Sequence, residues 1–209
     1  MSRIELLDLL HQGLHKLNQP QPAKVEHALI NFIELISKWN RAYNLTAIRD
    51  LDAMVVRHLL DSLSIAPYIK GNVILDVGTG AGLPGIPLAL IFPDKQFVLV
   101  DSNQKKTRFL VQAVHALHLT NVKIVHQRVE ELTHELFDTV ICRAFSTLRE
   151  FLISSKKFAK PQGRFLAMKG VYPLIELEDL PEGFSIVGAH RLEIPALDAE
   201  RHLIEVGLT

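Results

Sequence analysis

Three glycines alternate with small residues in the stretch "DVGTGAGL", and an aspartate, Asp76, stands just before them. An apolar run precedes Gly78, Gly80 and Gly82 and another follows them, so the glycines are predicted to lie between a strand and a helix. Glycine in such a loop permits positive φ and lets the backbone approach a ligand closely. A second carboxylate, Asp101, ends the next apolar run, "QFVLVD". An open loop flanked by two carboxylates predicts a ligand that carries positive charge.

Two ligands compete for this loop. Gly80, Gly82 and Gly85 fit the G-x-G-x-x-G pattern of dinucleotide-binding loops, which hold pyrophosphate at a helix N-terminus. With these glycines the pattern would begin two residues later after the strand than it does in dinucleotide-binding loops. It would also place the Asp76 carboxylate beside the dianionic pyrophosphate. S-adenosylmethionine has no phosphate and carries a sulfonium and an ammonium, and Asp101 is placed to accept both ribose hydroxyls. The pattern favours S-adenosylmethionine over a nicotinamide dinucleotide, with a plain tight turn as the remaining alternative.

Other side chains with reactive groups also have plain structural explanations. Cys142 lies in the apolar run "FDTVICRAF", where a thiolate could attack a pyrimidine C5 atom; a small buried side chain is the alternative. The same run lacks the Asn/Asp-Pro-Pro-aromatic sequence with which amino-directed methyltransferases orient an NH₂ group. The pairs His11/His15 and His115/His118 have one-face helical spacing, but neither is joined by a cysteine or an acidic partner, so no metal site is predicted.

The overall composition indicates a globular protein without a membrane span. The 209 residues hold one cysteine, which excludes an internal disulfide and fits a reducing cytoplasm. No apolar run reaches the roughly 18 residues of a membrane helix, and the N-terminus does not resemble a signal peptide. The net charge is zero, but residues 101–170 hold 12 Lys and Arg against 6 Asp and Glu, and residues 171–209 hold 2 against 8. A basic face on the protein surface therefore remains possible although the net charge is zero.

The elements that must position these residues divide into two segments. Residues 1–70 show apolar side chains at helical spacing and predict a helical extension with a helix at about 52–65 and a loop over 41–50. Residues 71–209 alternate short apolar runs with helical segments, which predicts a mostly parallel seven-stranded sheet with helices on both faces. The link between the last two strands is too short for a crossover helix, so we expect these two to pair antiparallel at an edge. The expected strands are 73–77, 96–100, 122–126, 138–142, 163–168 and two C-terminal ones, with helices at about 84–92, 104–118 and 147–158.

Taken together, these stretches resemble one family. The loop and the runs "LVDSNQKKTRFL", "QRVEEL", "ICRAFSTL", "AMKG", "KWNRAYNLTAIRD", "VRHLLDSL" and "PALDAERHLI" are similar to the bacterial 16S rRNA guanine-N7 methyltransferases, also called glucose-inhibited division protein B. The resemblance spans nearly the whole chain. Ala81, where the family often has proline, and Cys142, where serine is common, are departures that remove no binding group.

The resemblance implies a Rossmann-like class I methyltransferase fold and transfer of a methyl group from S-adenosylmethionine to N7 of a guanine in the 530 loop, leaving S-adenosylhomocysteine. It implies ligand contacts at Gly78, Leu83, Val129, Glu130 and Arg143. The implied substrate is 16S rRNA, the 30S subunit or an assembly intermediate, and we expect a monomer without a metal. A binding module that transfers nothing, or an enzyme acting on another RNA, remains open, because N7 chemistry needs no catalytic base whose absence would be visible.

Enzymes that read RNA loops use aromatic and guanidinium planes together with basic contacts to the backbone. Arg143 is the first candidate for positioning the substrate, because it ends a central strand, where ligands bind in open α/β sheets. Trp39 could instead pack in the core, and Lys105, Lys106 and Arg108 could be a solvated helix face. The further RNA-binding candidates are Arg41, Tyr43, Arg57, His58, Lys169 and Arg201. Tyr43 is expected in the loop at the mouth of the pocket.

Overall fold

The computed structural model describes residues 1–133 and 136–209. The chain opens with two long helices, and the first is capped by Ser2, whose hydroxyl accepts from the Glu5 amide while the Glu5 carboxylate accepts from the Ser2 amide. The predicted helix at 52–65 forms, but its centre is a π-helix, η1. The elements of the extension are α1 (Arg3–Lys16), α2 (Ala23–Tyr43), α3 (Leu51–Met54), η1 (Val55–Leu60), α4 (Asp61–Leu63) and the 3₁₀ turn η2 (Ala66–Tyr68).

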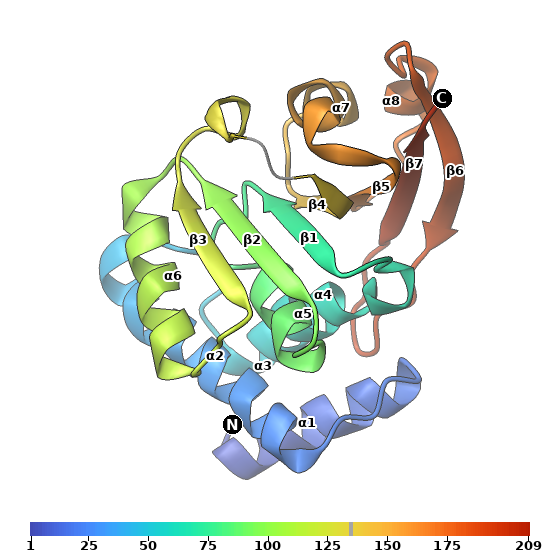
Figure 1. Cartoon of the computed structure of the whole chain (residues 1–209). Helices are drawn as coiled ribbons and strands as arrows, with labels where there is room; N and C mark the ends of the chain where they lie inside the picture. The colour runs from blue at the N-terminus through green and yellow to red at the C-terminus, as the bar shows by residue number, and fades with distance from the viewer. Residues whose placement is uncertain (134–135) are drawn as a thin grey trace.

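In the described part of the core, seven strands form one sheet in the order β3-β2-β1-β4-β5-β7-β6 (Figure 1). The first five run parallel, and β7 pairs antiparallel with both β5 and β6, as the short C-terminal link predicts. The strands are β1 (Val73–Val77), β2 (Gln96–Asp101), β3 (Val122–His126), β4 (Phe137–Arg143), β5 (Ala159–Lys169), β6 (Phe184–Arg191) and β7 (His202–Leu208). The core helices are α5 (Gly85–Ile91), α6 (Gln104–Ala116), α7 (Leu148–Ser155) and α8 (Leu174–Glu178), with 3₁₀ turns η3 (Val129–Glu131) and η4 (Lys156–Phe158).

The strand order reverses direction at β1. The chain passes from β1 outward to β2 and β3, then returns to place β4 on the other side of β1. Helices that cross over in opposite directions leave a crevice at this point, outside the carboxyl ends of the strands. The glycine loop after β1 opens at that crevice, and so do the ends of β2 and β4.

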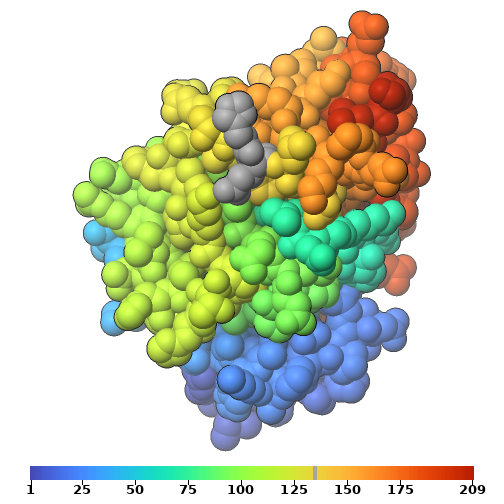
Figure 2. All heavy atoms as spheres, viewed as in Figure 1, coloured from blue at the N-terminus to red at the C-terminus, as the bar shows by residue number. Residues whose placement is uncertain are grey.

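Helices cover both faces of the sheet, and each face has its own apolar core. On one face α5, α6 and the N-terminal extension share a cluster in which Phe32 of α2 stacks on Phe109 of α6, with ring centroids 6.4 Å apart. On the other face α7 packs Phe151 edge-on against Phe165 of β5. The extension forms a continuous surface with the core in the space-filling view (Figure 2). The expected boundary at residue 70 therefore falls between η2 and β1, across a shared core.

The uneven charge along the chain is partly cancelled by folding. Basic residues of the 101–170 segment form ion pairs with acids of the last segment, which lie on the neighbouring C-terminal elements. These pairs are Arg149–Asp179, Lys169–Glu176 and Arg164–Glu205. The charge difference between the two segments thus does not translate directly into one basic face. Among the helices of the described residues, none has both the length and the apolar character needed to span a lipid bilayer.

Candidate active site

The glycine loop leaves β1 in a left-handed conformation that other residues rarely adopt. Gly78, Gly80 and Gly82 have φ of +65°, +63° and +84°. At Gly82 a Cβ atom would also lie 2.8 Å from the Leu110 side chain and 2.9 Å from Ile86, so α5 and α6 leave no space for one. The loop amides of Gly78 and Thr79 both donate to the Val100 carbonyl of β2. The backbone is therefore fixed in its course across the carboxyl ends of β1 and β2.

Asp76 holds this loop from inside. Its Oδ2 atom accepts from the Thr79 hydroxyl at 2.6 Å and from the Gly85 amide at 2.9 Å, and the side chain has no exposed surface. Burial raises the pKa of this carboxyl to about 6, and its Oδ1 atom is buried without a partner. Asp76 therefore orders the loop, and its predicted electrostatic attraction for a cationic ligand stays a prediction. Leu83 is also buried in the core, so its side chain is not available to a ligand and only its backbone atoms could make a contact.

Asp101 lies at the mouth of the loop. Its Oδ2 atom accepts from the Gly80 amide at 2.9 Å, its Oδ1 atom accepts from the Asn103 amide at 2.8 Å, and Lys106 lies 3.8 Å away. Asp101 borders a cavity of about 300 Å³. The cavity is lined by Val77, Gly78, Val100, Asp101, Ser102, Lys106, Gln127, Arg128, Val129, Glu130 and Phe145. We call this space the nucleoside pocket, and it brings together four of the predicted ligand residues.

The nucleoside pocket has hydrogen-bond acceptors and apolar walls that suit S-adenosylmethionine. The carboxylates of Asp101 and Glu130 can accept from ribose hydroxyls and an adenine amino group, and both attract a cation. Val77, Val100 and Val129 supply apolar walls for a ring. The loop amides point to Asp101 and to the Val100 carbonyl, so they are not arranged to cradle a phosphate. The residues present therefore fit this ligand better than a dinucleotide.

A second cavity of about 440 Å³ lies beside the first, and arginine and lysine side chains form part of its border. Five of the residues predicted to meet RNA or substrate line it, and they come from η1, β4, β5 and the segment just before β7. Its lining residues are Ile48, Arg57, His58, Asp61, Arg143, Ala144, Phe145, Met168, Lys169, Gly170 and Arg201. We call this space the basic cleft. Arg143 borders the basic cleft and is absent from the lining of the nucleoside pocket, and its expected contact with the cofactor stays a prediction.

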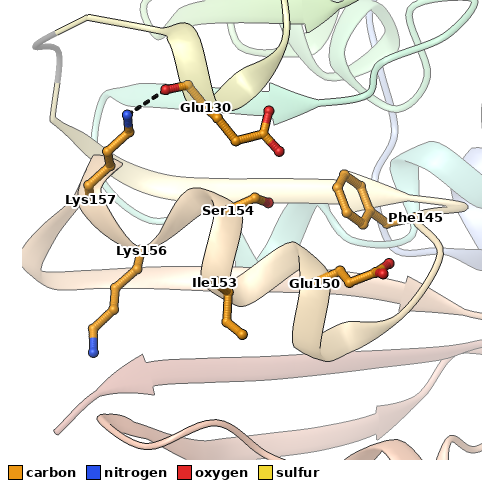
Figure 3. Close-up of a pocket in the computed structure, with 7 residues that line it drawn as sticks. All are labelled: Glu130, Phe145, Glu150, Ile153, Ser154, Lys156 and Lys157. Carbon is orange, nitrogen blue, oxygen red and sulfur yellow. Dashed lines mark hydrogen bonds between the residues drawn. The ribbon is translucent and has the colours of Figure 1, made fainter.

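Phe145 forms a wall common to both spaces. It follows Ala144, whose φ is +59°, and its ring also borders a third cavity of about 670 Å³ over α7. In the close-up of that cavity the ring and the Glu130 carboxylate lie on the same side, while Lys157 reaches up to the Glu130 carbonyl, 2.6 Å away (Figure 3). A base in the basic cleft and a ligand in the nucleoside pocket would thus meet across this ring.

Two of the predicted RNA-binding residues lie outside both the nucleoside pocket and the basic cleft. Arg41 is exposed on the last turn of α2 and lines neither the nucleoside pocket nor the basic cleft. Tyr43 was expected in a loop, but α2 continues through it and its ring packs on Trp39, 5.2 Å between centroids. Trp39 in turn meets Phe109 edge-on at 5.8 Å, which supports the core interpretation of this residue. The helix persists because the apolar face of α2 extends to its end, and Asn44 then closes it in the left-handed conformation.

Sequence reasoning missed Asp61 and Phe145 as site residues. Both lie inside quoted runs, "VRHLLDSL" and "ICRAFSTL", and both line the basic cleft. The signal for Asp61 was its place four residues after Arg57 in a helix, which puts the two on one side. Nothing in the local sequence marks which distant side chains meet it.

His58 is buried in the cleft wall as a neutral group. It lies 3.0 Å from the Thr46 hydroxyl and 3.1 Å from the Arg57 carbonyl, and burial together with nearby Arg143 lowers its pKa from 6.5 to about 4. At neutral pH it therefore adds no positive charge for RNA, contrary to the role expected of a basic residue.

The lowered pKa of His58 predicts a loss of stability in acid. Between pH 6.5 and 4 the unfolded chain binds a proton at this position and the folded chain does not, so acid favours unfolding. Relative to His58→Gln, we expect the wild-type free energy of unfolding to fall by about 3 kcal/mol over that interval. Urea titrations at pH 7 and 4.5 measure it. Parallel pH profiles of the two proteins would contradict the prediction.

Cys142 is absent from the lining of both the nucleoside pocket and the basic cleft. It is buried on the α7 side of β4, and burial raises the pKa of its thiol well above the ordinary value. A neutral, enclosed thiol does not suit nucleophilic attack on a pyrimidine. Within residues 1–133 and 136–209, no three His, Cys, Asp or Glu side chains come together as a metal site would require.

Solved structures with this architecture are methyltransferases of varied substrates. TrmN from Thermus thermophilus superposes with a TM-score of 0.58 at 19% identity, covering 81% of this chain and 53% of that one. Magnesium protoporphyrin IX methyltransferase from Synechocystis PCC 6803, solved with bound S-adenosylmethionine, gives 0.60 at 18% identity, covering 83% and 91%. The sheet order, the glycine loop and these neighbours define a class I S-adenosylmethionine-dependent methyltransferase fold.

Comparison by sequence narrows the class to one family. The family model described as rRNA small subunit methyltransferase G matches residues 25–204, and the chain belongs to this family. The ribosomal RNA small subunit methyltransferase G of Aeromonas salmonicida is 51% identical over 178 residues, 85% of this chain and 86% of the relative. That of Coxiella burnetii is 46% identical over 202 residues, 96% and 98% of the two chains.

Proposed function

We propose that this protein transfers a methyl group from S-adenosylmethionine to N7 of a guanine in the 530 loop of 16S rRNA. The observation that carries the proposal is the junction at Phe145, where a nucleoside pocket with two carboxylates adjoins a cleft bordered by arginines. Membership of the rRNA small subunit methyltransferase G family supports the RNA class, and the resemblance noted above supplies the guanine and its loop.

The reaction depends on how the base and the methyl donor are positioned more than on acid–base catalysis. Guanine N7 carries a lone pair and no proton, so it can attack a methyl donor without a general base. When bound, S-adenosylmethionine supplies an electrophilic methyl group and leaves as S-adenosylhomocysteine. The chain's part is to hold the base and the donor in line and to exclude water, for which proximity contributes at most about 7–11 kcal/mol.

The residues divide this work between the two spaces. Asp101, Glu130 and the loop at Gly78 orient the nucleoside, and the Phe145 ring offers a face on which a base can stack. Arg143 and Arg201 in the basic cleft hold the RNA backbone. No step in this scheme requires a metal ion bound to the protein, so we expect protein that has been treated with a chelator and then freed of it to methylate RNA as fast as untreated protein.

We further propose that the substrate is presented as a folded RNA or as a 30S subunit or its assembly intermediate, in the cytoplasm. The net charge of zero supports this, because a neutral protein gains little non-specific attraction to phosphates and depends on the shape of its target. We propose that one chain acts alone.

The direct test is transfer of labelled methyl from S-adenosylmethionine to 16S rRNA and to 30S subunits that lack the modification. Cleavage specific for 7-methylguanine would then map the label. We expect one labelled guanine in the 530 loop. Cofactor binding without transfer to either substrate would instead favour a binding module or a different RNA.

A further inference from the structure

Asp61, in the N-terminal extension, bonds with two arginines of the core. Its Oδ2 atom accepts from Arg143 Nη1 at 3.1 Å, and its Oδ1 atom accepts from Arg201 Nε at 2.9 Å. The three residues come from α4, the end of β4 and the segment just before β7. Arg143 also donates to the Arg57 carbonyl of η1 at 3.2 Å. One carboxylate thus fixes two guanidinium groups that are 58 residues apart in the sequence.

The carboxylate lies behind the guanidinium groups as seen from the cleft. The Asp61 side chain is 4% exposed, whereas those of Arg143 and Arg201 are 21% and 23% exposed, and all three border the same cavity. Each guanidinium has five N–H donors, and the bonds to Asp61 use only one on each. Further bonds run from Arg143 Nη1 to the Arg57 carbonyl and from Arg201 Nη1 to the Glu200 carbonyl. Each guanidinium still keeps N–H donors that these bonds do not use, and its exposed surface can meet a ligand in the cleft.

Charge counting favours an anion at this place. Two guanidinium groups share one carboxylate, which leaves one positive charge uncompensated, and Arg57 borders the same cleft. Lys169 contributes less, because Glu176 lies 2.8 Å from its amine. His58 is neutral at pH 7. The excess positive charge of the cleft thus lies on Arg57 and on the pair that Asp61 holds, in the cavity that Phe145 also lines.

We infer that Asp61 is a positioning residue, which holds Arg143 and Arg201 as a paired receptor for a backbone phosphate of the RNA. This inference rests on the proposed function and assigns the N-terminal extension a part in substrate recognition. Guanidinium groups suit a phosphodiester because their planar forks match its oxygens in a bidentate manner. Fixing both groups in advance removes the ordering cost that two flexible side chains would otherwise carry on binding.

The alternative is that Asp61 only ties the extension to the core. The two explanations predict opposite effects of one substitution, Asp61→Asn, on RNA binding. Asp61→Asn preserves the shape and removes a negative charge from the cleft, so charge alone would strengthen RNA binding. If Asp61 positions the arginines, the same substitution weakens RNA binding, because the amide cannot accept from both guanidinium groups.

The experiment measures binding of a fluorescein-labelled RNA fragment that carries the 530 loop, by anisotropy at several salt concentrations. For Asp61→Asn we expect about tenfold weaker binding and a log–log salt slope smaller by about 1, the value of one lost phosphate contact. KM for RNA should rise about tenfold with kcat within about threefold. Binding of S-adenosylmethionine, followed by calorimetry, should stay within about twofold. Asp179→Asn, which breaks the exposed pair with Arg149, is the matched control and should change none of these.

Stability gives an independent readout in a second background. In an Arg143→Gln, Arg201→Gln protein the Asp61 carboxylate is buried without a cation, so adding Asp61→Asn should raise Tm and leave the weakened RNA binding unchanged. RNA binding by Asp61→Asn that is unchanged or tighter overturns the inference. So does an equal loss of S-adenosylmethionine affinity. These binding results are separate from methyl transfer, so failure of wild-type protein to methylate 16S rRNA would overturn the proposed function instead.

Discussion

Replacing Asp101 with alanine is expected to weaken binding of S-adenosylmethionine by about a hundredfold or more. Asp101 ends β2 at the border of the nucleoside pocket, with one carboxylate oxygen on the Gly80 amide and the other on the Asn103 amide. Each oxygen has a second lone pair for a ribose hydroxyl. Hydrogen bonds to a charged group contribute about 1.5–3 kcal/mol each, so losing two of them costs at least a hundredfold in affinity.

The substitution also removes the acceptor for the Gly80 amide, which loosens the loop that borders the pocket. Asp101→Asn is the graded control, because its amide oxygen can still accept from Gly80. We expect calorimetric titration to rank the affinities as wild type, then Asp101→Asn, then Asp101→Ala, with S-adenosylhomocysteine following the same order. A dissociation constant for Asp101→Ala within twofold of wild type would remove Asp101 from the ligand site.

Gly85→Ala is expected to lower Tm by about 5–10 °C. In most helices this substitution stabilises by about 0.5–1 kcal/mol, since glycine loses more backbone entropy on folding. Here a Cβ atom would lie 2.2 Å from the Leu99 side chain and 2.7 Å from Asp76 Oδ2, both buried. Overpacking of that kind costs about 1–3 kcal/mol, and displacing Asp76 also breaks its bond to the Gly85 amide.

The clash therefore exceeds the gain in propensity, and a change of 2–4 °C for each kcal/mol gives the shift stated. Gly170→Ala is the matched control, because its nearest neighbour would be Arg201 at 4.0 Å, and Tm should move by about 1 °C or less. Thermal unfolding followed by circular dichroism measures both. A Gly85→Ala protein as stable as wild type would mean that α5 can shift away from β1 and β2 at no cost.

The sequence predicted the sheet well wherever a strand is a continuous apolar run. The runs at 73–77 and 122–126 became β1 and β3 with the same bounds, and the antiparallel C-terminal pair formed. The strand expected at 163–168 was too short, because β5 begins at Ala159 and passes through Pro161 and Gly163, which usually mark turns. Its pairing with β4 is irregular there, jumping from Phe137 with Ala159 to Thr139 with Arg164.

The site was predicted less completely because its contacts join distant parts of the chain. Acids at strand ends follow from local pattern, so Asp101 was found and does border the pocket. The meeting of Asp61 with Arg201 spans 140 positions and depends on how the extension packs. Burial also decides whether a polar residue faces a ligand: Asp76 and His58 have suitable side chains, but both lie inside the wall. The hydrophobic periodicity of the sequence does not show whether a polar side chain faces a ligand or lies inside the wall.

The shared Phe145 wall has a consequence for inhibitor chemistry. Among the described residues, Phe145 is the one that lines both the nucleoside pocket and the basic cleft. A compound that joins an adenosine to a phosphate-bearing fragment by a short linker could occupy both spaces at once. Its second half would then bind at the high effective concentration that a short linker confers, often millimolar. Other S-adenosylmethionine enzymes share the adenosine half of such a compound, so its selectivity would come from the arginine-lined half.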